Sequence, residues 1–447
     1  MSQHNEAEAA VRTMGGLGVR AIRLLYTDLH GVARGKDIPI GHFGAMCEEG
    51  VTFCAAVMGT DLRHTPVVGG EAGYVDFAIK PDLDTLRAVP WQQEVAWCLG
   101  EAWTLDGSEH WPSCPRALLR RVVDEYAARG LTPIVAPELE FFLAERDPAA
   151  ENGLRRYVDE LSRVYTVGAV SDPRGVVLKM LLWCDDLGLQ AFAANHEFMN
   201  SQYEINLRHA DAMTAADRAF LLKSSIKDIA AQHGLIATFM GKPFNDQGGS
   251  GTHIHLSLNR NGLNAFAADG PDGVSDELRW FIAGTLEHAR ALMAFLNPTI
   301  NAFRRIQPDS LAPTHANWGF DNRSTFVRVP PERGGATRVE IRVGDGAANP
   351  YLAIAAVLAA GTDGVRRRLE PPEPVAGDAY RADPEHAGGR LPASLDEALD
   401  ALEADDVLTS ALGTEIVDTF LAVKRFEAER HRAWVSDWEI QEYLHHL

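Results

Sequence analysis

Apolar and polar residues alternate within four stretches of this chain, and each alternation predicts a β-strand with one buried face. The stretches are residues 132–145, 195–207, where the alternation covers 204–207, 248–258, where a glycine turn precedes it, and 337–343. Their polar faces carry Glu138 and Glu140, Glu204 and Asn206, His253, His255 and Ser257, and finally Arg338, Glu340 and Arg342. A single strand of this kind ordinarily has one face buried and its polar face exposed to solvent. Four of them suggest a polar cavity inside a curved sheet.

Helical periodicity covers much of the remaining chain. It predicts helices at residues 117–129, 211–233, 275–296 and 347–365, and through the last fifty residues. Short extended segments predominate before the proline-containing stretch HWPSCPR, whereas the first ten residues are polar and indicate a loose tail. We therefore predict an α+β protein with a small strand-rich domain, residues 1–110, followed by a larger domain, residues 111–447.

Composition narrows the range of partners and compartments. The chain has 447 residues, 46% of them hydrophobic, and a net charge of −20, which argues against nucleic acid or an anionic membrane as partner. Its five cysteines form no CxxC pair, so a disulfide framework or zinc ribbon is not expected. Neither a signal-peptide core nor an apolar run of about 20 residues is present. We expect a soluble cytoplasmic protein.

Carboxylates that converge in a polar cavity repel one another and need cations. Mg²⁺ or Mn²⁺ fits a set made of carboxylates and a single imidazole. Arginines also cluster between residues 304 and 342, where a polyanionic substrate, namely nucleotide phosphates with a carboxylate, would account for them. Enzymes that transfer phosphoryl groups combine divalent metal ions with arginines. The chain contains neither GxxxxGKS/T nor GxGxxG, so a P-loop or Rossmann site is excluded.

Seven motifs, in order along the chain, resemble the glutamine synthetase superfamily. They are PELEFF (137–142), NHEFMNSQYEIN (195–206), ATFMGKP (237–243), GSGTHIHLSL (249–258), NAFRRIQPDSLAP (301–313), NRSTFVRVP (322–330) and TRVEIRVGDGAANPYL (337–352). The resemblance implies an N-terminal β-grasp domain and a catalytic domain with a curved antiparallel sheet surrounded by helices. It also implies a dodecamer of two hexameric rings, with active sites between subunits.

The resemblance further implies ATP and at least two Mg²⁺ or Mn²⁺ ions. By motif position, one ion would be held by Glu138, Glu197 and Glu204, and the second by Glu140, His253 and Glu340. The acid substrate would be bound by Gly249, His253, Arg305 and Arg342. The nucleotide and the transferring phosphoryl group would be held by His255, Ser257, Arg323, Arg328 and Arg338. Arg305, Arg323 and Arg342 would be the catalytic arginines. The implied reaction forms a γ-glutamyl phosphate, which an amine then attacks.

Two departures from the family pattern bear on the amine. The family has an acid in an N-terminal loop where this chain has Cys54 or Ala55, and a Glu in a flexible loop where this chain has Leu311. An ammonium ion needs carboxylates around it, whereas these replacements make a roomier, more apolar pocket. The resemblance is therefore to the γ-glutamyl-amine ligases, whose substrates are polyamines, ethanolamine or alkylamines in amine utilisation or detoxification.

Several alternatives remain open from the sequence. Asp309 could replace the missing Glu, which would leave a glutamine synthetase that uses ammonium. Gly248 stands where the family commonly has Asn, which allows an acid other than glutamate. Asp61 and Glu71 could meet the distal ammonium of a polyamine, although solvated loop acids would look the same. A non-catalytic structural or sensor relative is the remaining hypothesis, and the presence of all six metal-ligand positions argues against it.

Overall fold

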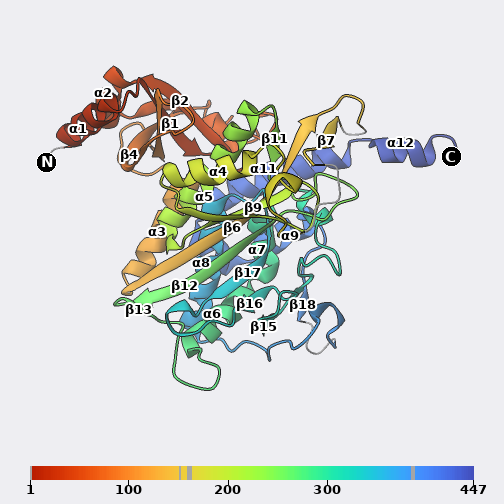
Figure 1. Cartoon of the computed structure of the whole chain (residues 1–447). Coiled ribbons are helices and arrows are strands. Elements are labelled where there is room, and N and C mark those ends of the chain that lie inside the picture. Colours follow the sequence, from red (N-terminus) through yellow and green to blue (C-terminus); the bar gives the residue numbers. More distant parts are fainter. Residues whose placement is uncertain (1–2, 151–152, 159–163, 384–387) are drawn as a thin grey trace.

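The computed structural model describes residues 3–150, 153–158, 164–383 and 388–447. In this part of the chain the N-terminal residues form a mixed sheet in the order β2-β1-β5-β4-β3, with β1 and β5 parallel (Figure 1). Its strands are β1 (Ala21–Thr27), β2 (Ala33–Pro39), β3 (Val51–Cys54), β4 (Asp76–Ala88) and β5 (Val95–Trp103). Helices α1 (Gln3–Gly16) and α2 (Ile40–Glu49) accompany it. The β-grasp assignment and the domain boundary near residue 110 stay predictions.

Residues 3–10 belong to helix α1, so the expectation of a loose tail was wrong for them. Ala7 is fully buried, and Ala10, Val11 and Met14 pack beside it against the N-terminal core. Their spacing of three and four residues is that of one helix face. Glutamates between these positions obscure the apolar stripe in the sequence.

A second, larger sheet carries the four predicted polar strands. Its order is β15-β16-β17-β12-β6-β9-β8 in the described residues, antiparallel throughout except for β15 and β16. The four are β6 (Leu131–Arg146), β9 (Gln202–Leu207), β12 (Gly251–Arg260) and β17 (Val339–Asp345), and they are direct neighbours. The others are β8 (Ala191–His196), β15 (Trp318–Phe320) and β16 (Val327–Val329), with β7 (Leu154–Arg156), β10 (Ala210–Asp211), β11 (Ile236–Thr238) and β13 (Leu263–Asn264) at the margins. A separate pair joins β14 (His315–Ala316) to β18 (Gly389–Arg390).

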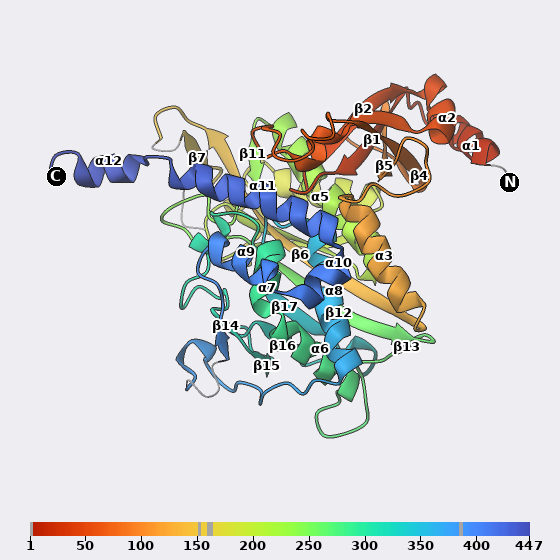
Figure 2. The same ribbon diagram turned by 180° about the vertical axis from the view of Figure 1, so that it is seen from behind.

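Helices cover one face of the larger sheet, and Figure 2 shows α3, α8, α10 and α11 lying in front of the strands. The helices of the catalytic part are α3 (Pro115–Ala127), α4 (Val176–Asp186), α5 (Ala212–Gln232), α6 (Asp276–Glu287), α7 (Ala289–Leu296), α8 (Pro350–Arg367), α9 (Leu395–Glu403), α10 (Asp406–Leu412), α11 (Thr414–Arg432) and α12 (Asp437–Tyr443). The alternate residues Ile254, Ile341 and Leu139 point into this helical layer and are at most 2% exposed. The α+β architecture with a curled sheet is therefore confirmed.

The single helix expected at residues 275–296 is two helices, α6 and α7, which meet at His288. Its ring nitrogens lie 2.6 Å from Asp405 and 3.3 Å from Asp363, carboxylates on other segments of the chain. No glycine or proline marks the break in the sequence, so a long-range contact sets it. In the described residues no helix has the length and apolarity needed to cross a lipid bilayer.

A buried ionic network joins the N-terminal sheet to the helices that cover the larger sheet. Arg116 at the start of α3 is 3% exposed and donates to Asp217 on α5 at 2.8 Å, to Glu101 on β5 at 2.7 Å and to Asp82 on β4 at 2.7 Å. Tyr351 on α8 also donates to Asp217 at 2.6 Å. Such a network fixes the two sheets relative to each other.

We expect Asp217→Asn to lower the free energy of unfolding by about 3 kcal/mol, because it leaves part of the buried Arg116 charge uncompensated. Urea unfolding at fixed protein concentration measures this. Asp396→Asn is the matched control, since its ion pair with Arg432 is exposed and its loss costs less than about 1 kcal/mol. Equal effects of the two variants would contradict the structural role given to Arg116.

Candidate active site

Strand pairing brings the predicted carboxylates together on the face of the sheet that the helices leave open. Glu140 on β6 lies opposite Glu204 on β9, and Glu138 lies opposite Asn206. Glu197 follows β8, the next strand along. Burial and the neighbouring carboxylates raise the pKa of Glu204 to about 10 and the pKa of Glu197 to about 7. The cluster therefore holds more carboxylates than its own residues can neutralise.

Histidines and arginines surround the other side of this cluster. His253 Nδ1 and His255 Nε2 lie 3.0 and 3.4 Å from the two oxygens of Glu138. Burial alone would raise the pKa of Glu138, but these hydrogen bonds outweigh it and hold the pKa well below its ordinary value. Glu340 accepts from Arg342 and, at 2.6 Å, from Arg328. These charges overcome burial and lower the pKa of Glu340 to about 2.

The donors fit a hard divalent ion, and a glycine leaves room for one. His253 is held through Nδ1, which leaves Nε2 as a ligand. A Cβ added at Gly251 would lie 3.3 Å from that Nε2 and 3.5 Å from Glu140 Oε1, so glycine keeps the space between them open. In the described residues no three such groups yet converge closely enough to hold an ion. Asn195 and Asn206 bond to Glu197 and Glu204, and metal binding would therefore require these side chains to rotate.

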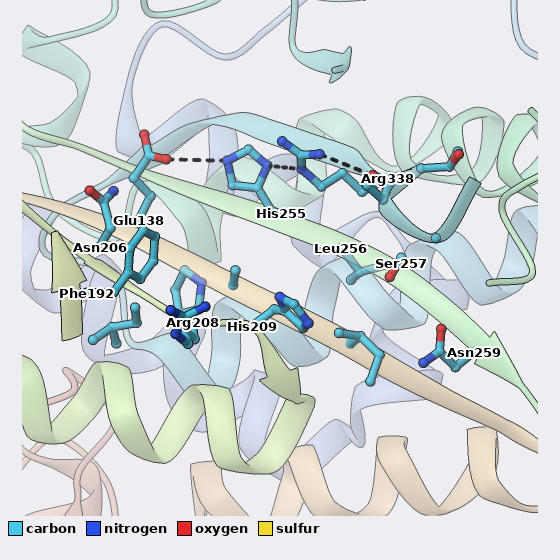
Figure 3. A pocket seen from close by; sticks show the side chains of 17 residues that line it. Glu138, Phe192, Asn206, Arg208, His209, His255, Leu256, Ser257, Asn259 and Arg338 are labelled. Atoms are coloured by element: carbon cyan, nitrogen blue, oxygen red, sulfur yellow. Dashed lines mark hydrogen bonds and ion pairs between the residues drawn. The ribbon is translucent and has the colours of Figure 1, made fainter. Parts of the chain in front are cut away.

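A cavity of about 550 Å³ opens beside the cluster, and Figure 3 shows its lining. Glu138 lies at one end, while His255, Ser257 and Arg338 line the wall. Arg338 donates to His255 Nδ1 at 3.2 Å, which leaves the His255 Nε2–H to donate to Glu138. This volume suits a nucleotide. Three of the five residues predicted to hold the nucleotide and its phosphoryl group share this wall, whereas Arg323 and Arg328 do not line the cavity.

Arg305 lies under the loop that precedes β12, residues 248–251, which we call the acid loop. It is 6% exposed and donates to the carbonyls of Val343 and Gly344. A Cβ at Gly249 would lie 2.3 Å from Arg305 Cγ, so only glycine lets this loop pack on the arginine. Arg342 Nε donates to the carbonyl of Arg323 at 3.0 Å, whereas the Arg323 side chain itself is exposed.

Cys54 and Leu311 lie apart from the metal cluster. Cys54 ends β3 on the N-terminal sheet, and its thiol donates to the carbonyl of Tyr74 at 3.6 Å. Leu311 lies on the loop after Arg305, 46% exposed and in the left-handed region with φ 57°.

The three acids that could have attracted a cationic amine lie in different environments, one of them buried and two exposed. Asp61 is fully buried against Arg430 on α11 and accepts from two backbone amides, so its interpretation as a solvated loop acid was wrong. Asp309 lies 3.6 Å from Arg381. Glu71 is exposed. At Gly248, an added Cβ would lie 3.1–3.3 Å from Met199, so that side chain occupies the space of the family's Asn.

Two residues at the site were missed in the sequence. Gln202 shares the polar face of β9 with Glu204 and Asn206, so the alternation that revealed those two could also have revealed it. Asp345 continues the apolar face of β17 after Val343, fully buried and 3.8 Å from Arg305 Nε. A charged residue on a core face was the available signal.

Comparison with known proteins identifies the family. The model of the "Glutamine synthetase, catalytic domain" family matches residues 112–443. The chain belongs to the glutamine synthetase family. It is therefore a carbon–nitrogen ligase of the glutamine synthetase type, a family of nitrogen metabolism whose members use ATP and divalent metals.

Individual relatives extend over almost the whole chain. Glutamine synthetase of Thermotoga maritima is 36% identical over 437 residues, 96% of this chain and 97% of that protein. Solved structures of apo GmaS and of a GmaS/ADP complex superpose with TM-scores of 0.86 and 0.87 at 32% identity, covering 97% of this chain and 99% of theirs. The resemblance inferred from the seven motifs is thus confirmed.

The raised pKa of Glu197 predicts a pH-dependent stability that metal should reverse. Its ordinary value is 4.5 and its folded value is about 7, so the stabilisation is complete below pH 4.5 and is lost as pH rises through 7. Without metal, Glu197→Gln should be nearly as stable as the wild type at pH 4 and more stable by about 3 kcal/mol at pH 8. Unfolding curves at both values measure this.

Saturating Mg²⁺ should abolish the advantage of Glu197→Gln, because an ion replaces the proton on the wild-type carboxylate. Glu49→Gln, an exposed substitution on α2, is the control and should leave the pH profile unchanged. A difference between wild type and Glu197→Gln that is constant with pH, or unaffected by Mg²⁺, would contradict the site.

Proposed function

We propose that the protein is an ATP-dependent ligase that joins the γ-carboxylate of glutamate to a small organic amine through a γ-glutamyl phosphate. The observation that carries this proposal is the apolar, exposed Leu311 on a loop whose one acid, Asp309, lies beside Arg381. An ammonium pocket needs a free carboxylate at this point. The likeness to GmaS, a gamma-glutamylmethylamide synthetase, supports the same acceptor class.

In this mechanism the residues of the chain bind and orient the substrates and neutralise their negative charge. Arg305 and Arg342 hold the carboxylate of the acid substrate, with Gly249 and His253 beside it. His255, Ser257, Arg328 and Arg338 hold ATP, and Arg323 moves onto the phosphoryl group from its exposed position. Two Mg²⁺ or Mn²⁺ ions, when bound, would polarise the phosphate oxygens and offset their charge. Fixed arginine charges around the transferring group stabilise its transition state.

The carboxylate cluster can also assist the second step. A protonated amine is unreactive, so the acceptor must lose a proton before it attacks the acyl phosphate. Glu197 has a pKa of about 7 in the metal-free chain, and the same carboxylate bound to metal is ionised. An ionised carboxylate of the cluster takes this proton, and the free amine then attacks the acyl carbon. As the C–N bond forms, the bond from this carbon to the phosphate oxygen breaks, and the departing phosphate takes the second proton from nitrogen, which completes the amide.

A small monoamine fits better than a polyamine. A distal ammonium needs its own carboxylate, yet Asp61 is buried with Arg430. Glu71 is exposed, and it is a single acid in a loop. Methylamine and other short alkylamines need only the apolar surface that Leu311 offers.

The acceptor site also requires assembly. Cys54 lies on the N-terminal sheet, and a neighbouring copy would bring it to the entrance beside Leu311, as in a dodecamer of two hexameric rings. The C-terminal segment supports assembly, because Trp434, Trp438, Leu444 and Leu447 are 60–98% exposed on the projecting helix α12 and beside it (Figure 1). Apolar surface of this extent is typical of a contact between subunits. We place the enzyme in the cytoplasm.

A glutamine synthetase that uses ammonium is the second candidate. The name of the 36% identical Thermotoga maritima relative favours it. The two candidates make different demands on the surroundings of Leu311. They also predict different preferred acceptors, which can be measured.

The acceptor preference is measured by phosphate release from ATP with Mg²⁺ and glutamate, across ammonium, methylamine, ethanolamine, putrescine and spermine. We expect methylamine to give a kcat/KM at least about tenfold above ammonium, because ammonium lacks the apolar contact and finds no carboxylate. Ammonium as the best acceptor would overturn the proposal in favour of glutamine synthetase. No release with any amine would argue against glutamate as the acid.

Leu311→Glu should move the preference towards ammonium, because it restores a carboxylate at the pocket. We expect the ratio of kcat/KM for ammonium to that for methylamine to rise at least about tenfold. Leu105→Glu, which adds the same charge at an exposed leucine of the N-terminal sheet region, is the control. An unchanged ratio in Leu311→Glu would show that this loop does not border the acceptor.

A further inference from the structure

Gln202 occupies the point where the carboxylate cluster meets the acid loop. It is 3% exposed at the start of β9, opposite Phe142 on β6. Its amide nitrogen donates to Glu140 Oε2 and to the carbonyl of Gly249, each at 3.0 Å. Its amide oxygen accepts from the Met199 backbone at 3.3 Å. Every polar atom of this buried side chain is therefore engaged.

These bonds divide the two oxygens of Glu140 between different tasks. Oε2 accepts from Gln202 and, at 2.7 Å, from the backbone amide of Gly251. Oε1 faces the space beside His253 that a Cβ at Gly251 would fill. One oxygen is thus fixed by the acid loop while the other is directed to the candidate metal position.

The acid loop also contacts the side-chain amide of Gln202. Gly249 presents its carbonyl to Gln202 and packs its Cα against Arg305, where no side chain could fit. Asn200 bonds to Gln247 just before the loop at 3.1 Å. A displacement of Gln202 would therefore move Glu140, Gly249 and the surface over Arg305 together.

We propose that Gln202 is a positioning residue that makes metal binding at Glu140 and ordering of the acid loop a single coupled event. Glu140 and His253 would hold the ion, which would supply positive charge beside the Glu140 carboxylate. With Oε1 so engaged, Oε2 would hold Gln202 and Gly251, and Gln202 would hold Gly249 over Arg305. Metal loading thereby prepares the surface that receives the acid substrate. That this loop binds the acid substrate rests on the proposed function. The coupling between metal and loop rests on the contacts of Gln202.

Gln202→Met tests this, because methionine has a similar length and cannot make these hydrogen bonds. Hydrogen–deuterium exchange of residues 247–251 is measured with and without Mn²⁺. In the wild type we expect Mn²⁺ to slow exchange about tenfold, and in Gln202→Met to leave it within about twofold of the metal-free rate. Mn²⁺ affinity by calorimetry should fall about tenfold or more.

Asn195→Leu is the matched control. This substitution removes the amide that donates to Glu197 at 2.5 Å. Within the described residues, Asn195 makes no hydrogen bond to the acid loop. The variant should keep the Mn²⁺-dependent protection of residues 247–251. Thermal unfolding of both variants verifies that each is folded at the temperature used.

Kinetics separate positioning from a general structural role. Gln202→Met should raise the KM for the acid and the Mn²⁺ activation constant about tenfold, with the KM for the amine within about twofold. Mn²⁺-dependent protection that persists in Gln202→Met, or is missing in the wild type, would overturn the proposal. Calorimetry with glutamate and no ATP tests the proposed acid separately, so its failure leaves the exchange result decisive for Gln202.

Discussion

Repulsion among carboxylates on one face of the larger sheet is the constraint on which the rest of the site depends. Glu140 and Glu204 are register partners on adjacent strands, and burial makes their charge harder to sustain. The chain compensates only part of it, through the histidines at Glu138 and the arginines at Glu340. What remains uncompensated is the driving force for binding a divalent cation, and the bound ion in turn prepares the site for a polyphosphate.

The fold can hold these carboxylates side by side because the opposite face of the same strands is almost wholly apolar. Leu139, Ile254 and Ile341 pack into the helical layer and hold the strands in register. A slip of one residue would exchange the two faces and bury the glutamates. The apolar face therefore fixes the positions of the charged one, and the Arg116 network fixes the N-terminal sheet relative to both.

Local alternation was sufficient to predict the four strands and the side chains on their polar faces, since both follow from a period of two. It could not predict that the strands are neighbours in the order β17-β12-β6-β9, because that order is set by tertiary pairing. Long-range contacts also decide the features that were missed. The helix break at His288 depends on Asp363 and Asp405, and the burial of Asp61 depends on Arg430, over three hundred residues away. Gln202 carried a readable signal, because it shares the polar face of β9 with Glu204 and Asn206, whereas the roles of Cys54 and Leu311 stay proposals.

Anomalous diffraction from crystals grown with Mn²⁺ and ADP tests the metal centre most directly. The account predicts two manganese peaks per chain, one bordered by Glu138, Glu197 and Glu204 and the other by Glu140, His253 and Glu340. A single peak at either position would require the ligand sets to be merged. The absence of manganese from both, with ADP bound in the cavity beside His255, would contradict the claim that unbalanced carboxylate charge on this sheet exists to bind divalent ions.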